Sequence, residues 1–205
     1  RVDHESDEAI DPDVEESVIG NVREHISGAR ALLLSDYNKG VLTAGVISNC
    51  IQLARQHGIP VVANAKPTGI SFYSGADLVS LNAREASEAV GAKDILRQSN
   101  GSGLSDMPRD TALKLQRDHK IGHILITLGE YGMCTESFYI SPEKVEVFDT
   151  AGAGDTTIAA VAMGMASVGF QPNIFEFAAQ ASAAVVTHVG VAVPSRDDIE
   201  RILRA

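Results

Sequence analysis

The chain has 205 residues, of which 44% are hydrophobic and 21% charged, a composition typical of one globular α/β domain. Its 27 acidic residues outnumber its 17 Lys and Arg residues, and the formal net charge of -10 argues against a nucleic-acid partner bound through its phosphates. No stretch approaches the roughly 20 consecutive apolar residues of a membrane-spanning helix, so we expect a cytoplasmic protein without a membrane partner.

The first part of the chain alternates predicted helices with predicted strands. Apolar residues recur every four positions over residues 12–28, which is the stripe of an amphipathic helix. The short apolar run at 31–34 has the length of a buried strand. The alternation continues with helices at 43–57, from 82 onward and at 106–119, and with strands at 59–63, 77–80 and 121–128.

The second part keeps this order and adds a glycine-rich loop. We expect a loop at 99–108, a last strand at 145–148, and three helices at 154–168, 173–188 and 195–203. Strands and helices that alternate at this spacing predict one α/β domain over residues 1–205, with a mainly parallel sheet covered on both faces. The ligand site is then expected at the carboxyl ends of the strands.

The most informative segment is the glycine-rich loop Asp149-Thr150-Ala151-Gly152-Ala153-Gly154-Asp155-Thr156-Thr157. Gly152 and Gly154 let the backbone approach a ligand, and the following helix directs unsatisfied N–H groups and its positive dipole end at the loop. Asp155 would repel a resident pyrophosphate, yet it can accept the proton of an attacking hydroxyl. The loop therefore suits phosphoryl transfer, with Asp155 as the base and the amides of 152–154 neutralising the migrating group.

These residues also have a purely structural explanation. Asp155 can simply stabilise the helix dipole, and the two glycines can simply form a tight turn. The spacing does exclude two better known phosphate loops, because Thr157 stands where a dinucleotide-binding fingerprint needs Gly or Ala, and no Gly-Lys-Ser/Thr follows. From the residues alone, the catalytic and the structural interpretation both stay open.

Two shorter segments carry weaker signals. In Thr127-Leu128-Gly129-Glu130-Tyr131-Gly132, the glycine amides and the Thr127 hydroxyl can face a nucleotide phosphate, although these residues alone favour a hairpin turn. Asn82-Ala83-Arg84-Glu85 has the spacing of a helix capping box, and Glu85 can also organise Mg²⁺ and its waters. The capping role and the metal role are compatible.

Together, the three segments resemble those of the ribokinase-like (PfkB) sugar kinases in their order and approximate spacing. Residues 149–155 resemble the family's Asp-Thr-x-Gly-Ala-Gly-Asp signature, 127–132 its nucleotide-phosphate turn, and 82–85 its Asn-x-x-Glu motif. The resemblance implies a three-layer α/β/α fold with a mainly parallel central sheet. The resemblance also implies roles in phosphoryl transfer, with Asp155 as catalytic base and Gly152, Ala153 and Gly154 as anion hole. It places Thr127, Gly129 and Gly132 at the nucleotide phosphates, and His188 and Gly190 beside the adenine. It further places Asn82 and Glu85 near Mg²⁺, and Asp149 and the Ala151 carbonyl at a monovalent-cation (K⁺) site.

Within that family, the segment Leu34-Ser35-Asp36-Tyr37-Asn38-Lys39-Gly40 resembles the Ser-Asp-Tyr-x-Lys-Gly of D-glycero-β-D-manno-heptose 7-phosphate kinases, the kinase half of bifunctional ADP-heptose synthases. Asp36 follows a strand, where it can bind a sugar hydroxyl, and Lys39 can bind a phosphate. Solvated charges in a strand-to-helix turn are the alternative. Lys66 is a third substrate candidate, within Asn64-Ala65-Lys66 where the subfamily has Asp-Pro-Lys.

The resemblance implies an ATP-dependent phosphotransferase that acts on a hydroxyl of a small sugar or sugar phosphate, with heptose 7-phosphate as the leading acceptor. The alternatives are another sugar, a nucleoside, or a nucleotide-binding module without catalysis. The resemblance covers the C-terminal two-thirds of a kinase domain, so we expect its N-terminal strands and small β lid to be absent from these residues. Sheet edges exposed in this way favour a homo-oligomer.

Overall fold

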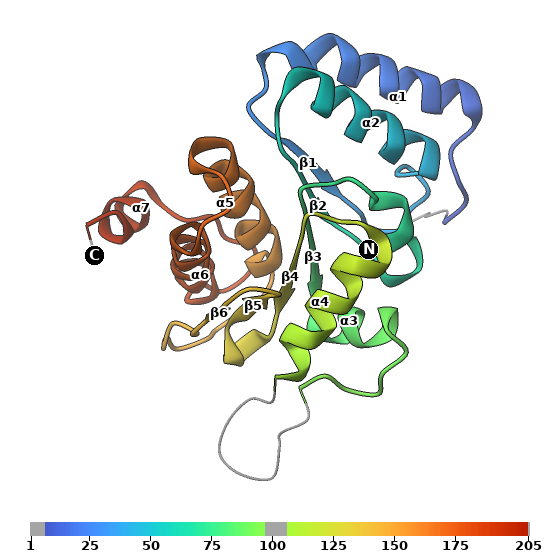
Figure 1. The fold of residues 1–205 in the computed structure, drawn as a ribbon. Coiled ribbons are helices and arrows are strands. Elements are labelled where there is room, and N and C mark those ends of the chain that lie inside the picture. Colours follow the sequence, from blue (N-terminus) through green and yellow to red (C-terminus); the bar gives the residue numbers. More distant parts are fainter. Residues whose placement is uncertain (1–6, 97–105, 205) are drawn as a thin grey trace.

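The computed structural model describes residues 7–96 and 106–204, which form a six-stranded sheet flanked by helices (Figure 1). The strands lie in the order β1-β2-β3-β4-β5-β6; β1 to β4 are parallel, and β5 and β6 continue the sheet in antiparallel pairs. The strands are β1 Leu32–Ser35, β2 Val61–Asn64, β3 Leu78–Asn82, β4 His123–Thr127, β5 Met133–Thr135 and β6 Tyr139–Ile140. The α-helices are α1 Pro12–His25, α2 Ala44–His57, α3 Ala83–Ala89, α4 Met107–His119, α5 Ala153–Val168, α6 Pro172–Val186 and α7 Arg196–Ile202.

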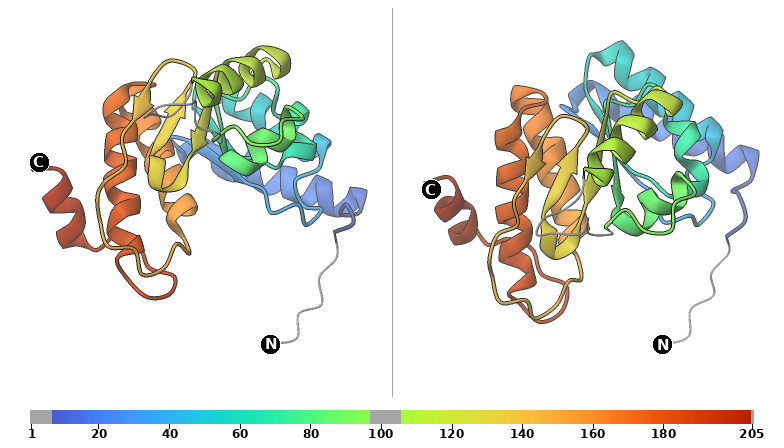
Figure 2. Two further views of the ribbon diagram at one scale, coloured as in Figure 1. Left: turned by 90° about the horizontal axis from the view of Figure 1, so that it is seen from below. Right: turned by 60° about the horizontal axis from the view of Figure 1, so that its bottom comes forward.

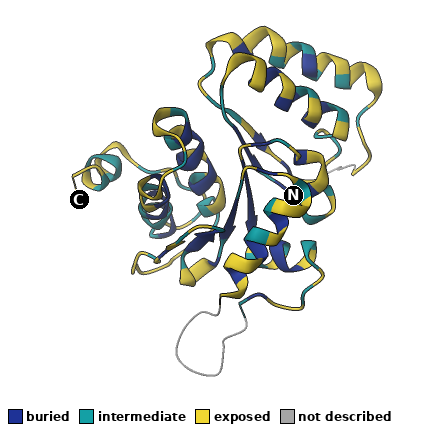
Figure 3. Ribbon diagram, viewed as in Figure 1, coloured by how far each residue is buried: buried dark blue, intermediate teal, exposed yellow. Residues whose placement is uncertain are grey.

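Helices cover both faces of the sheet, as the views from below make plain (Figure 2). The alternating side chains of each strand explain this arrangement. In β4, Ile124 and Ile126 enter the core under α1 to α4, whereas Leu125 enters the core under α5 and α6. The central strands β2 to β5 are accordingly mostly buried, whereas the edge strands β1 and β6 also carry exposed residues (Figure 3). The three-layer α/β/α prediction is confirmed. Over the described ranges, no helix has the length and apolar character that crossing a bilayer requires.

Capping residues determine where several helices begin and end. The Thr43 side chain accepts a hydrogen bond from the Val46 N–H at 3.0 Å and so caps α2, which ends at Gly58 in a left-handed conformation. Asn82 caps α3 in a reciprocal capping box with Glu85. These local signals explain why the predicted helix boundaries lie within a few residues of the observed ones.

The predicted strand at 145–148 is wrong. This segment follows Pro142 and runs as an irregular strap, attached to α6 where the Phe148 N–H donates to the Val186 carbonyl at 2.8 Å. The outer strand of the sheet on this side is instead β6, which together with β5 is too short to give a clear alternating pattern. Of the loop predicted at 99–108, residues 99–105 lie outside the described residues, and Met107 and Pro108 begin α4.

Strand β1 forms the opposite edge of the sheet. No strand pairs with its outer side within the described parts of the chain, and Leu33 on this strand is exposed. An unpaired strand edge supports self-association, which stays a prediction.

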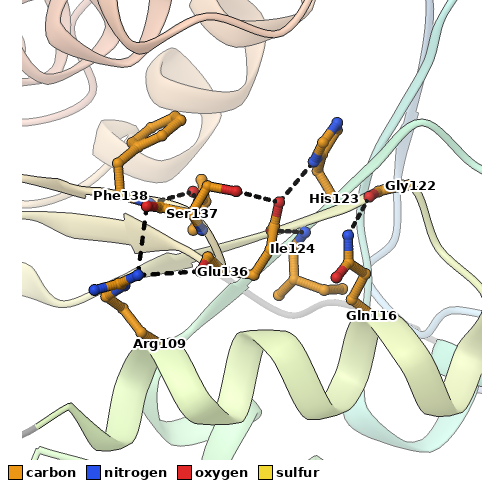
Figure 4. A network of polar contacts seen from close by, with 9 residues as sticks. Arg109, Gln116, Gly122, His123, Ile124, Glu136, Ser137 and Phe138 are labelled. Carbon is orange, nitrogen blue, oxygen red and sulfur yellow. Dashed lines mark hydrogen bonds and ion pairs between the residues drawn. The ribbon is translucent and has the colours of Figure 1, made fainter.

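A partly buried ion pair joins His123 of β4 to Glu136 just after β5, and Arg109 links this hairpin to α4 (Figure 4). The Glu136 carboxylate, 6% exposed, accepts from His123 Nδ1 at 2.7 Å and from the Ile124 N–H at 3.2 Å. Arg109 of α4 donates to the Glu136 and Ser137 carbonyls. Burial alone would raise the pKa of Glu136, but the hydrogen bonds from His123 and from backbone N–H groups outweigh it and hold the pKa below its usual value.

We expect Glu136→Gln to lower the free energy of unfolding by about 1–3 kcal/mol at pH 7, because the variant loses a buried charge-assisted bond. Since the pKa of Glu136 is lower in the folded than in the unfolded state, its contribution is complete above about pH 4.3 and disappears as the pH falls through the folded value. Urea unfolding at pH 7, 5 and 3.5 measures this trend. The control is Glu24→Gln, because Glu24 is exposed. If the loss of unfolding free energy in Glu136→Gln were as large at pH 3.5 as at pH 7, the assignment would be contradicted.

Candidate active site

The predicted site residues gather at the carboxyl ends of the parallel strands. Asp36 directly follows β1, Lys66 lies two residues beyond β2, Asn82 ends β3 and Thr127 ends β4. The register places these ends side by side, since Asn82 pairs with Thr127. A site built from several strands therefore forms at one edge of the sheet.

The glycine-rich loop delivers the start of α5 to the same edge. Gly152 adopts φ +83°, a left-handed conformation that favours glycine. The Ala153 N–H donates to the Thr150 carbonyl at 3.2 Å, whereas the N–H groups of Gly152 and Gly154 have no hydrogen-bond acceptor within the described residues. The unsatisfied donors of the predicted anion hole are thus those of Gly152 and Gly154, and Asp155 lies exposed in the same turn.

Asp149 holds this loop in place. Its Oδ1 accepts from the Ala151 N–H at 2.9 Å and its Oδ2 accepts from the Gly190 N–H at 3.1 Å. The segment after α6 is thereby attached to the glycine-rich loop, and the exposed side chain of His188 stands outside this link. The Ala151 carbonyl oxygen accepts no hydrogen bond from the described residues, and its role at a monovalent-cation site stays a prediction.

A cavity of about 370 Å³ opens between the two glycine turns. Its lining includes Thr127, Gly129 and Gly154 together with the carboxyl-bearing Glu130 and Glu143, and most of the remaining lining is apolar. The apolar wall comes from the strap and from α6, with Val145, Val147, Ala179, Ala183 and Val186. A flat apolar group joined to an anionic group matches this lining. The turn that holds Thr127 joins antiparallel β4 and β5, so the hairpin interpretation is confirmed, and the nucleotide-phosphate role of the turn stays a prediction.

The loop after β1 is organised around a buried carboxylate. Asp36 is 9% exposed; its Oδ1 accepts from the Asn38 N–H at 2.7 Å and its Oδ2 from the Tyr73 hydroxyl at 3.1 Å. Burial, and then the negative charge of Asp36, raise the pKa of Tyr73, which keeps its hydroxyl a donor. Lys39 is partly exposed and forms an ion pair with Asp7 at 2.9 Å.

A half-buried ion pair joins a candidate substrate residue to a candidate metal residue. Lys66 Nζ contacts Glu85 Oε1 at 2.7 Å, while Glu85 Oε2 accepts from the Asn82 N–H at 2.9 Å. Both oxygens of Glu85 therefore have partners in the protein. The capping interpretation of Asn82 and Glu85 is confirmed, and the Mg²⁺ role stays a prediction.

Sequence reasoning missed one contact at this edge. The Tyr37 hydroxyl donates to Asp155 Oδ1 at 3.1 Å, which links the loop after β1 to the start of α5. Tyr37 lies inside the motif that directed attention to Asp36 and Lys39, but a polar aromatic residue in a turn gives no signal of its own. The strap's part of the apolar wall, Val145 and Val147, was missed as well, because this segment was expected to be a strand of the sheet.

Known proteins are similar to this chain in sequence. The family model described as pfkB family carbohydrate kinase matches residues 8–198. The bifunctional protein HldE of Pelobacter propionicus is 38% identical over 172 residues, which cover 82% of this chain and 34% of that protein. The bifunctional protein HldE of Campylobacter jejuni subsp. jejuni serotype O:6 is 35% identical over 207 residues, covering 100% of this chain and 43% of that protein. The chain thus spans less than half the length of these curated relatives.

Solved structures share its fold. Phosphofructokinase-2 from Escherichia coli in complex with potassium superposes with a TM-score of 0.78 at 22% identity, covering 96% of this chain and 63% of that chain. Ribokinase from Arabidopsis thaliana complexed with ribose and ATP gives 0.68 at 20% identity, covering 97% of this chain and 61% of that chain. Because the family model matches most of the sequence and the fold agrees with it, the chain belongs to the pfkB family of carbohydrate kinases.

Proposed function

We propose that the protein transfers the γ-phosphoryl group of ATP to a hydroxyl of a heptose 7-phosphate. The observation that carries this proposal is the first turn of α5, where the Asp155 carboxylate stands beside the unsatisfied N–H groups of Gly152 and Gly154. A carboxylate next to anion donors suits a site that receives a hydroxyl and a phosphoryl group together.

In the proposed reaction, Asp155 accepts the proton of the acceptor hydroxyl while the hydroxyl oxygen forms a bond to the γ-phosphorus. The bond between that phosphorus and the β,γ-bridging oxygen breaks, and ADP leaves with the bond's electron pair. The N–H groups of Gly152 and Gly154 stabilise the charge on the equatorial oxygens. The positive end of the α5 dipole adds to that stabilisation.

The nucleotide is proposed to bind in the cavity between the glycine turns. The apolar wall formed by the strap and α6 suits adenine, and the N–H groups of Gly129 and Gly154, which have no acceptor within the described residues, suit the phosphates. Mg²⁺ is usually held by one or two carboxylates together with substrate phosphates and waters. Glu85, whose oxygens already contact Lys66 and the Asn82 N–H, is proposed to hold an ion that would arrive with ATP through its remaining lone pairs or a bound water. The Ala151 carbonyl and Asp149 are the proposed ligands of K⁺.

The acceptor is proposed to lie against the loops after β1 and β2. These loops carry Lys39 and Lys66 in a chain whose net charge is -10, and a phosphorylated acceptor needs such local cations. The resemblance of residues 34–40 to the heptose 7-phosphate kinases points to the same class of acceptor. Asp36 is proposed to orient this loop and to meet a sugar hydroxyl with its remaining lone pairs.

A panel of acceptors tests the proposal in the full-length protein. We expect ADP formation with heptose 7-phosphate to exceed, in kcat/KM, that with the unphosphorylated heptose, another sugar phosphate, ribose or adenosine by at least about tenfold, the effect of one lost charged contact. Phosphorus NMR identifies the product. A preference for an unphosphorylated sugar or a nucleoside would contradict the substrate. ATP binding without transfer to any acceptor would contradict the activity and favour a binding module.

A further inference from the structure

We infer that Tyr37 is a positioning residue for the catalytic base, an assignment that rests on the proposed function of Asp155. The Tyr37 hydroxyl donates to Asp155 Oδ1 at 3.1 Å from a loop that is 118 residues away in sequence. This bond occupies one carboxylate oxygen and leaves Oδ2 for the acceptor hydroxyl. A carboxylate that is held in one rotamer starts closer to the geometry of proton transfer.

The loop that carries Tyr37 is itself held in a fixed shape. Asn38 adopts φ +54° and donates its N–H to buried Asp36 at 2.7 Å. Gly40 has φ +79°, and a Cβ there would collide with the carbonyl oxygen of Glu8. The Ile10 N–H also donates to the Gly40 carbonyl at 3.1 Å. Tyr37 therefore projects from a turn with two left-handed residues and a buried anchor, which favours a defined position of its hydroxyl.

The ring of Tyr37 contributes little packing, because the residue is 61% exposed. The hydroxyl is thus the part of the side chain with a specific partner. In this arrangement the Tyr37 hydroxyl joins the loop after β1, which is proposed to bind the acceptor, to Asp155. The acceptor and the base are then held in a fixed relative position. A role of this kind affects the rate of the chemical step rather than the affinity for ATP.

Two variants of the full-length protein test the inference. We expect Tyr37→Phe to lower kcat about five- to tenfold, the effect of one ordinary hydrogen bond, and to leave both KM values within about twofold. Tyr37→Leu, which also removes the ring, should match Tyr37→Phe within about twofold. An active parent whose kcat is unchanged in Tyr37→Phe would overturn the inference, and so would a loss that appears only in the KM of the acceptor.

A double-mutant cycle checks the contact without any need for activity. Urea unfolding midpoints of Tyr37→Phe, Asp155→Ala and the combined variant should be non-additive, because each single variant removes the contact; the double variant should lie closer to each single variant than the summed shifts require. Additive shifts would overturn the contact itself. If the parent transfers phosphate to no acceptor but the cycle is non-additive, the proposed function fails while the contact stands.

Discussion

Asp155→Asn should lower kcat by about 10³-fold while the affinity for Mg-ATP changes by less than about threefold, in keeping with the usual contribution of a general base. Asparagine keeps the size of the side chain and can still accept a hydrogen bond from Tyr37, so the fold and the nucleotide site stay intact. Only the ability to take a proton is lost. Steady-state kinetics of acceptor phosphorylation, with nucleotide binding measured separately, gives both quantities.

The control for this experiment is Asp110→Asn. Asp110 lies exposed in the first turn of α4, so it has the same favourable position relative to a helix dipole as Asp155, without a place in the site. Both variants should lose about 0.3–1 kcal/mol of stability at most. If Asp155 served only the dipole, the two variants would have equal turnover, and that outcome would refute its role as base.

Gly154→Ala should lower kcat/KM for ATP by about 10- to 100-fold without destabilising the protein, because a displacement of about 1 Å at a reacting group has effects of this size. Gly154 lines the cavity, has a helical conformation, and would place a Cβ with no protein atom within 4 Å. The added methyl group therefore meets the space proposed for the phosphates. The free energy of unfolding rises when alanine replaces glycine in a helix, because alanine has the higher helix propensity.

Gly20→Ala is the matched control for Gly154→Ala. Gly20 lies within α1, and a Cβ there also finds no atom within 4 Å. Both variants should leave the free energy of unfolding unchanged or raise it by up to about 1 kcal/mol. Only Gly154→Ala should lose activity, measured as ATP-dependent phosphorylation. Full activity in Gly154→Ala would mean that the phosphates bind elsewhere.

The fold was largely predictable because strong local signals agree with the tertiary packing. The apolar runs that became β1, β2 and β4 are short and bounded, and each core helix carries an apolar face. The segment at 145–148 is also a short, mostly apolar run, yet it pairs with no strand of the described residues and lines the cavity instead. Strand formation depends on a partner that the local sequence does not specify.

The candidate site was predictable in its glycine turns and less so in its contacts. Gly152 and Gly132 both require left-handed backbone conformations, which is why glycine marks these turns in the sequence. The ion pair of Lys66 with Glu85 and the bond of Tyr37 to Asp155 join residues 19 and 118 positions apart. Such pairs follow from the order of the strands in the sheet, and sequence spacing alone does not reveal them.

Calorimetric titration of Mg-ATP into the 205-residue chain, once circular dichroism has shown it to be folded, tests the central claim most directly. The account predicts saturable binding with one nucleotide per chain, since the cavity, the glycine turns and the start of α5 all lie within these residues. A folded chain that binds no Mg-ATP would contradict the placement of the nucleotide between Gly129 and Gly154.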